Sequence, residues 1–215
     1  MIQVQDKKRK VTLAKRIMGK VKHGLVLQSI KNQLARIGIK IFPYYWVQEG
    51  INPTEMPEIK GIVSDYTVEF IEAEEIKKIE ENLTTYSMDG ILAYMNAGKR
   101  CLALKHKGEI ASFLFINLKE VDFSSLNISL KNDEAYLTYM YTMESFRGKN
   151  LAPYLRYKSY EIIHKMGRNK IFSISEFFNS SAVRYKQKLN AKNLKLVLYI
   201  EIFKRLKWRF TLKTY

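Results

Sequence analysis

The sequence lacks several features that mark secreted and membrane proteins. Its 215 residues contain one cysteine, Cys101, so the chain can form no internal disulfide and a reducing compartment is predicted. No apolar run approaches the roughly 18 residues needed to cross a bilayer. The charged first residues are not followed by the apolar segment of a secretory signal. The sequence therefore predicts a cytoplasmic protein.

Patterns for several kinds of enzyme chemistry are also missing. The histidines are isolated from one another and show no metal-ligand spacing, so no metal site is predicted. Cys101 begins an apolar run, where a cysteine is usually buried and inert. No serine stands in a nucleophile-elbow pattern, and Gly148 alone supports neither a P-loop nor a dinucleotide fingerprint.

Proline is rare, and three of the four prolines fall within residues 41–61. The same segment holds the aromatic cluster Phe42, Tyr44, Tyr45 and Trp46. This composition predicts a connector without regular structure. Its aromatic rings are expected to fix the connector to the core, with a substrate groove or a membrane interface as the alternatives.

Positive charge is abundant and uneven. The chain has a formal net charge of +16, and residues 1–43 contribute eleven Lys and Arg against one Asp, a net +10. Such a surface favours acidic partners: phosphates, anionic lipid, nucleic acid or an acidic carrier protein. Composition does not choose among them.

Residues 7–40 show the spacing of one or two basic amphipathic helices. Leu13, Ile17 and Val21 recur every four residues, and a second apolar stripe runs from Leu27 to Ile37, before Gly38. Two interpretations stay open. The helices lie on the anionic inner face of a membrane, or they pack on their own domain with a solvated basic face.

From residue 62 the pattern changes to that of an α+β domain. We therefore predict two parts, a basic helical arm with its linker at 1–61 and a domain at 62–215. The expected strands are 62–71, the two arms of a hairpin in 101–116, 135–142, 170–175, 194–203 and 207–212; the expected helices are 72–83, 87–96, 153–166 and 179–189. Residues 121–132 are expected to be a loop.

A strand, a basic turn and a helix follow one another between residues 134 and 166. The turn contains Arg147, Gly148, Lys149 and Asn150, and Pro153 suits the first turn of the helix. Such a joint directs backbone N–H groups and a helix N-terminus at one place, which suits an anion and above all a pyrophosphate.

This order of elements, with Arg147-Gly148-Lys149-Asn150-Leu151-Ala152 at the turn, resembles the GNAT acyltransferase superfamily. The family signature there is Arg/Gln-x-x-Gly-x-Gly/Ala, so Arg147 and Ala152 match its ends, whereas Asn150 stands at the inner glycine. Asparagine tolerates unusual backbone angles better than most residues, which allows the turn to form. The resemblance covers roughly residues 62–215 and implies a mixed, mostly antiparallel sheet flanked by helices.

The resemblance also implies a helix that begins with Asn-x-x-Ala/Ser and carries a tyrosine, a lysine and Gly-Phe. Asn179, Ala182 and Lys188 are in register, but Tyr185 lies one position early and Lys186 occupies the usual place of the tyrosine. The Gly-Phe pair is replaced by Asn190-Ala191.

The function implied is transfer of an acetyl or other acyl group from acyl-CoA to an amine, by direct attack in a ternary complex. The CoA pyrophosphate is expected at Arg147 to Ala152, with Asn179 on the following helix. The thioester oxygen is expected at backbone N–H groups near Met140 to Thr142. No metal takes part, and an acyl-carrier protein is an alternative donor.

The acid and base of such a transfer are hypotheses at this stage. Tyr185 is a chemically suitable acid, and Glu176, at the end of a strand, is a candidate base, with Glu144 also near. The acceptor is an amino sugar, a small amine or a lipid-linked glycan precursor. The alternative function is an inactive GNAT-like module that binds anionic lipid or nucleic acid.

Overall fold

The computed structural model describes residues 31, 33–50, 55–83, 86–123 and 126–215. Most of the predicted basic helical arm therefore lies outside the described residues. Within them, residues 33–36 are helical. Gly38, with φ +84°, follows and ends this helix as predicted.

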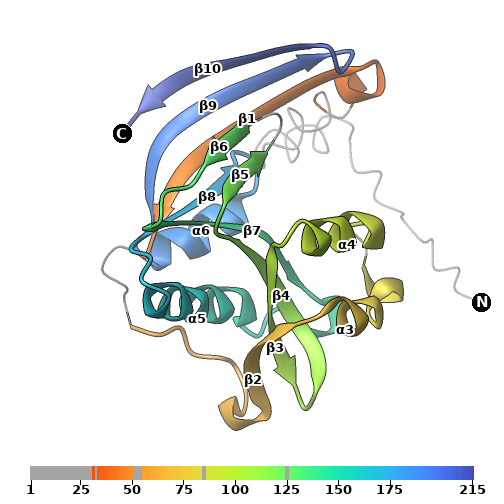
Figure 1. Cartoon of the computed structure of the whole chain (residues 1–215), viewed down its shortest axis with the longest axis vertical. Coiled ribbons are helices and arrows are strands. Elements are labelled where there is room, and N and C mark those ends of the chain that lie inside the picture. Colours follow the sequence, from red (N-terminus) through yellow and green to blue (C-terminus); the bar gives the residue numbers. More distant parts are fainter. Residues whose placement is uncertain (1–30, 32, 51–54, 84–85, 124–125) are drawn as a thin grey trace, which may run out of the picture. The chain divides into compact units, whose positions relative to one another are not determined.

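Eight of the strands form one sheet (Figure 1). Among the neighbouring strands whose register is described, β7 and β8 are parallel and the other pairs are antiparallel. The strand order is β10 (Leu206–Thr214), β9 (Lys192–Ile202), β1 (Ile39–Glu49), β8 (Lys170–Glu176), β7 (Glu134–Thr142), β4 (Glu109–Asn117), β3 (Arg100–His106) and β2 (Tyr66–Ile71).

Helices flank this sheet, and a small hairpin forms a second sheet. The α-helices are α3 (Ala73–Lys77), α4 (Met88–Asn96), α5 (Leu151–Lys165) and α6 (Ser180–Lys188); the hairpin pairs β5 (Glu120–Phe123) with β6 (Leu126–Ser129); the short 3₁₀ helices are η1 (Val63–Asp65), η2 (Glu80–Asn82) and η3 (Glu144–Phe146). The predicted class, an α+β fold with a mostly antiparallel sheet, is confirmed.

The chain divides into two compact units, which we describe separately. The larger contains residues 44–196 and 213–215. Its core is built by apolar side chains of the central strands, such as Leu102 and Phe113, with Ile76, Ile91 and Leu155 from the helices. Cys101 is buried in this core, as predicted, and burial raises the pKa of its thiol.

The smaller unit contains residues 1–43 and 197–212. Within it, Lys40 pairs with Glu201 at 3.0 Å, and the Phe203 N–H donates to the Gly38 carbonyl at 2.7 Å. Both faces of the β10 segment are exposed, including the rings of Trp208 and Phe210.

The prediction of a connector from residue 41 is wrong for residues 41–49, which belong to β1. Tyr44 to Glu49 pair antiparallel with β8, and Tyr44 and Val47 are buried. Pro43 cannot donate to a ladder, and it lies just before the first residue of this pairing. The expected role of the aromatic rings is confirmed for Trp46, which stacks on Tyr136 and Phe172.

Three other predicted segments differ from the structure. Residues 121–132 are not a loop throughout, because β5 and β6 form a hairpin there. The strand predicted over 62–71 begins only at Tyr66, after the 3₁₀ helix η1. The helix predicted over 72–83 is not continuous, because α3 ends at Lys77 and the separate 3₁₀ helix η2 follows. The remaining predicted strands and helices are present with shifts of a few residues at their ends.

Candidate active site

The parallel strands β7 and β8 pair along only part of their length. Their register runs from Glu134↔Lys170 to Leu137↔Ser173. Beyond this point β7 stays with β4, where Tyr141 lies opposite Phe113, whereas β8 stays with β1. The two strands therefore separate, and the last residues of β7 and β8 do not pair with each other.

A β-bulge lies on β7 just beyond the point of separation. Phe113 pairs with Tyr141 and Phe115 with Thr138, so β7 has one residue more than β4 over this stretch. Tyr139 accommodates the extra residue in the left-handed region, at φ +53°. Such bulges re-aim backbone and side-chain groups, and they are frequent beside active sites. The bulge falls next to Met140, where backbone donors were predicted.

The turn after β7 has the backbone that the sequence predicts for an anion site. Gly148 and Asn150 adopt left-handed conformations, with φ +81° and +65°. A Cβ on Gly148 would meet no atom within 4 Å, so the backbone there is open to a ligand. The expectation that Asn150 tolerates an unusual backbone angle is confirmed.

Helix α5 starts from this turn without a side-chain cap. Asn150 is its N-cap residue but makes no capping hydrogen bond, whereas Ser87 caps α4 and Asn179 caps α6. The first turn of α5 also carries no acidic residue. An uncapped helix N-terminus has unsatisfied N–H donors and a positive dipole end, both of which favour a bound anion.

The Asn150 side chain is engaged elsewhere, on the segment that precedes η1. Its Nδ2 donates to the Glu58 carbonyl at 2.7 Å, and the Lys60 N–H donates to the Lys149 carbonyl at 3.0 Å. These two bonds hold the turn against residues 58–60. They explain how the turn is fixed although asparagine replaces the family's inner glycine.

Comparison with solved structures shows the same architecture in acetyltransferases. A GNAT-family acetyltransferase from Colwellia psychrerythraea superposes with a TM-score of 0.56 at 11% identity, over 90% of this chain and 74% of that one. A GCN5-related N-acetyltransferase from Sphaerobacter thermophilus gives 0.53 at 9% identity, over 86% and 57%. The protein has the GNAT acyltransferase fold.

A third similar structure is the GCN5-related glucosamine N-acetyltransferase region of a fungal multi-domain GH3 beta-N-acetylglucosaminidase. Its TM-score is 0.56 at 9% identity, over 86% of this chain and 22% of that one. This chain thus spans 57% and 22% of the Sphaerobacter and fungal chains. No protein-family model and no curated protein matches the sequence.

In this GNAT fold the basic side chains of the turn contact other groups of the same segment. Arg147 Nε donates to the Thr142 carbonyl at 3.2 Å, and its guanidinium pairs with Glu144 at 3.1 Å. Lys149 Nζ lies 5.0 Å from the centre of the Phe146 ring. Leu151 is buried and Ala152 half-buried, so they contribute backbone rather than side-chain chemistry to the turn.

Asn179 and Glu176 lie between β8 and α6. Asn179 Oδ1 accepts from the Ala182 N–H at 3.1 Å and from the Ser181 hydroxyl at 2.8 Å, so this side chain caps α6. Glu176 is half-buried at the end of β8. Because side chains alternate along a strand, Glu176 is on the opposite face from Ser173 and Ser175.

Tyr185 is half-buried and packs against the core. Burial raises the pKa of its hydroxyl to about 12. The nearby charge of Arg156 opposes this shift, while Glu49 and Tyr86 add to it. Tyr86 in turn lies 4.7 Å, between ring centres, from Tyr139 of the bulge. Tyr185 therefore packs against the core, and its hydroxyl is a weak acid in this environment.

A buried ionic cluster that the sequence did not predict lies beside these residues. Arg156 of α5 donates to Glu49 of β1 through Nε at 2.7 Å and through a terminal nitrogen at 2.6 Å. Lys186 of α6 lies 3.3 Å from the same carboxylate. Tyr160 and Ser173 also donate to Glu49. Burial alone would raise the pKa of Glu49, but Arg156 and Lys186 lower it well below its usual range.

One pattern in the sequence could have indicated this cluster. Arg156 stands on the apolar side of α5 with Tyr160 and Ile163, where an arginine needs a buried acidic partner. The partner, Glu49, falls in the segment predicted as a connector. The burial of Glu49 depends on the position of β1 in the sheet, which the sequence pattern did not indicate.

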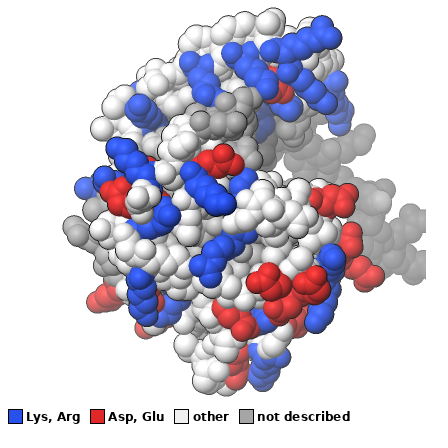
Figure 2. Space-filling view, viewed as in Figure 1, with Lys and Arg blue, Asp and Glu red and all other residues white. Residues whose placement is uncertain are grey.

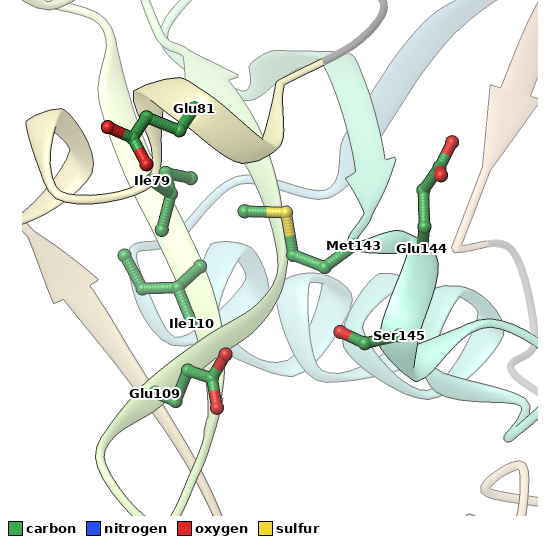
Figure 3. A pocket seen from close by; sticks show the side chains of 7 residues that line it. All are labelled: Ile79, Glu81, Glu109, Ile110, Met143, Glu144 and Ser145. Atoms are coloured by element: carbon green, nitrogen blue, oxygen red, sulfur yellow. The ribbon is translucent and has the colours of Figure 1, made fainter.

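A separate cavity of about 330 Å³ opens where β7 ends (Figure 3). Apolar side chains of Ile79, Ile110 and Met143 line it together with the carboxylates Glu81, Glu109 and Glu144 and with Ser145. The lining thus combines apolar contacts with negative charge, which suits a small organic cation. Figure 2 shows acidic side chains gathered over α3 and η2, the elements on one side of this cavity.

Among the residues that the structure describes, no group of three or more His, Cys, Asp or Glu is arranged to hold a metal ion. Over the same residues, no helix is both long and apolar enough to cross a membrane.

Proposed function

We propose that the protein is an acyl-CoA-dependent N-acyltransferase, which moves an acetyl or other acyl group to an amine. One observation carries the proposal. Strand β7 separates from β8 before its end, and the open left-handed turn and the uncapped N-terminus of α5 come directly after β7. A pyrophosphate bound at the turn would leave the thioester arm free to extend between the separated strands.

The acyl-CoA would be held mainly by backbone. N–H groups between Arg147 and Ala152 would donate to the pyrophosphate, and the charges of Arg147 and Lys149 would add to the favourable field. Backbone donors from Met140 to Thr142, beside the bulge, would stabilise the thioester oxygen as it becomes an oxyanion. Asn179 would contribute indirectly, because its side chain fixes the start of α6.

The acidic cavity at the end of β7 is our candidate for the amine acceptor. Glu81 and Glu109 would attract a protonated amine, and the apolar floor would hold its carbon skeleton. An amino sugar or a small amine fits this chemistry. The fungal neighbour is described as a glucosamine N-acetyltransferase region, which makes amino sugars the first class to test.

In this proposal the amine attacks the thioester directly while both substrates are bound. Attack requires a neutral amine, for which Glu176 or a chain of water molecules would accept the proton. The leaving thiolate requires a proton donor, for which the sequence suggests Tyr185. Both assignments are separate hypotheses from the acyl transfer itself.

The test is release of free thiol from acetyl-CoA in the presence of a panel of amino sugars and small amines. Cys101 is 1% exposed, so a thiol-reactive dye reports the released CoA rather than the protein. Thiol release that depends on one amine class supports the proposal. A protein that releases no thiol with any amine but binds anionic vesicles or RNA would instead be the inactive module.

A further inference from the structure

The buried cluster of Glu49, Arg156 and Lys186 contains more positive than negative charge. Arg156 and Lys186 share the carboxylate of Glu49. All three residues are at least nine-tenths buried, with exposures of 0%, 1% and 5%. When Lys186 is protonated, these three residues sum to one excess positive charge, in a place where an uncompensated charge is costly.

The excess charge lies where β8 leaves β7. Lys186 Nζ donates to Ser173 Oγ at 2.7 Å, to Ser175 Oγ at 2.8 Å and to the Ile174 carbonyl at 3.3 Å. Ser173 is the last residue of β8 that pairs with β7, and Ser175 lies beyond it. The ammonium group is therefore fixed beside the separated strands, where the proposed thioester arm would extend.

The position of Lys186 on α6 supports a chemical role. In the sequence it occupies the place of the tyrosine that the resemblance implies on this helix, and Tyr185 is one residue earlier. One residue corresponds to about 100° around a helix. The helix therefore directs Lys186 inward onto Ser173 and Ser175, while Tyr185 stays half-buried against the core.

We propose that Lys186 stabilises and then protonates the thiolate that leaves the acyl donor. In the step, the amine nitrogen forms a bond to the acyl carbon and the carbon–sulfur bond breaks, with its electron pair going to sulfur. One ammonium proton of Lys186 moves to that sulfur. The new amide nitrogen releases its extra proton to water, and neutral Lys186 regains a proton from solvent.

The surroundings of Lys186 suit this exchange. The pKa of its ammonium is lowered to about 8, because burial, with a smaller contribution from the charge of Arg156, outweighs the opposing effect of Glu49. This is close to the ordinary pKa of a cysteine thiol, about 8.5, so the ammonium suits proton exchange with a sulfur of similar basicity. Lys186 also faces the hydroxyls of Ser173 and Ser175 and the carbonyl of Ile174.

This inference rests on the proposed acyl-CoA function, and the test separates the two. Bound CoA is titrated by the ultraviolet absorbance of its thiolate, in the wild type and in Lys186→Met. In the wild type the pKa of the bound thiol should be about one unit lower than that of free CoA, which is a tenfold rise of its acid constant. In Lys186→Met this rise should disappear.

Desulfo-CoA, which lacks the sulfur, serves as the control ligand. Its affinity should be the same for the wild type and Lys186→Met, which also shows that the variant is folded. Ser175→Ala is a milder second variant that removes one bond to Nζ without changing charge, and it should reduce the shift. Tyr185→Phe should leave the shift intact.

Three results are decisive. An equal thiol pKa in bound wild type and bound Lys186→Met overturns the role of Lys186, and the cluster is then structural. Loss of the shift in Tyr185→Phe instead assigns the role to that tyrosine. Failure of both CoA and desulfo-CoA to bind refutes the proposed function itself.

Discussion

Glu49 and Arg156 are 107 residues apart in the sequence and meet through two hydrogen bonds of 2.6 and 2.7 Å. The pair joins the last residue of β1 to the middle of α5, the helix whose N-terminus forms the proposed anion site. The pair therefore links the position of the proposed anion site to the position of β1, a strand that the local sequence did not reveal.

Removing the carboxylate should be strongly destabilising. Glu49→Gln leaves Arg156 and Lys186 buried with no negative partner in the cluster, which typically costs about 3–5 kcal/mol. Urea unfolding of the variant at neutral pH measures the loss. Glu144→Gln is the matched control, because this carboxylate is exposed and pairs only at the surface with Arg147; its effect should stay within about 0.5 kcal/mol. An equally small effect of both variants would contradict the account.

The same carboxylate predicts acid sensitivity. The pKa of Glu49 is lowered in the folded protein from its ordinary 4.5, so the unfolded chain binds the proton first. Its contribution to stability is complete above about pH 4.5 and is lost as the pH falls toward the folded pKa. The difference in unfolding free energy between wild type and Glu49→Gln should therefore shrink as the pH is lowered below this value. A difference that does not change with pH would show that Glu49 is not charged in the fold.

Lys186 predicts a second rise of stability with pH, in the alkaline range. Its folded pKa of about 8 is below the ordinary 10.5, so the unfolded chain retains a proton that the folded protein has lost. Stability from this group should rise between about pH 8 and 10.5, and then level off. Lys186→Met should abolish this rise, as measured by unfolding at several pH values. A rise that persists in the variant would assign it to another group.

Two substitutions at Asn150 separate its backbone angle from its hydrogen bond. Asn150→Ala places at φ +65° a residue that tolerates this angle less well than asparagine, and it loses the bond to Glu58, at a combined cost of about 2 kcal/mol. Asn150→Gly loses the same bond but accepts the angle without strain. We expect CoA affinity to fall about tenfold in the alanine variant and by less than about threefold in the glycine variant, by calorimetry. Equal losses would mean that the left-handed turn does not set the site.

The basic arm predicts salt-sensitive binding to anionic vesicles. Residues 1–30 carry eight Lys and Arg against Asp6, a net +7, and each cation near an anionic surface contributes about 1 kcal/mol. Deleting residues 1–30, which leaves β1 whole, should abolish sedimentation with anionic vesicles. Neutral vesicles are the control.

Binding that survives this deletion would contradict a role for the arm. It would point to the β9–β10 hairpin, where Figure 2 shows Lys and Arg side chains and where Trp208 and Phe210 are exposed. Trp208→Ser would then be the variant to test.

The sequence predicted those parts of the fold that depend on residues close together in the chain. The strand, turn and helix from residue 134 to 166 are continuous in the chain, and their glycine, proline and apolar spacing determine the turn. The same holds for the α4 helix with its Ser87 cap and for the β3–β4 hairpin. The backbone of the proposed anion site therefore follows from local sequence, although bonds to residues 58–60 fix it in place.

The rest depends on contacts between distant segments. Glu49 bonds to Ser173 across 124 residues, and no local periodicity places β1 beside β8. The prolines of this segment suggested a linker, but the burial of Tyr44 and Val47 in the sheet outweighed them. Whether Lys186 or Tyr185 points inward also depends on how α6 packs. Motif spacing alone does not choose between these two adjacent residues.

The central claim is that the turn from Arg147 to Ala152 binds the pyrophosphate of CoA, and thermal unfolding in the presence of CoA tests it most directly. At about 100 times the dissociation constant, bound CoA should stabilise the wild type by roughly 2.7 kcal/mol, with a smaller effect in Asn150→Ala at the same concentration. No stabilisation of the wild type at CoA concentrations up to about millimolar would contradict the account.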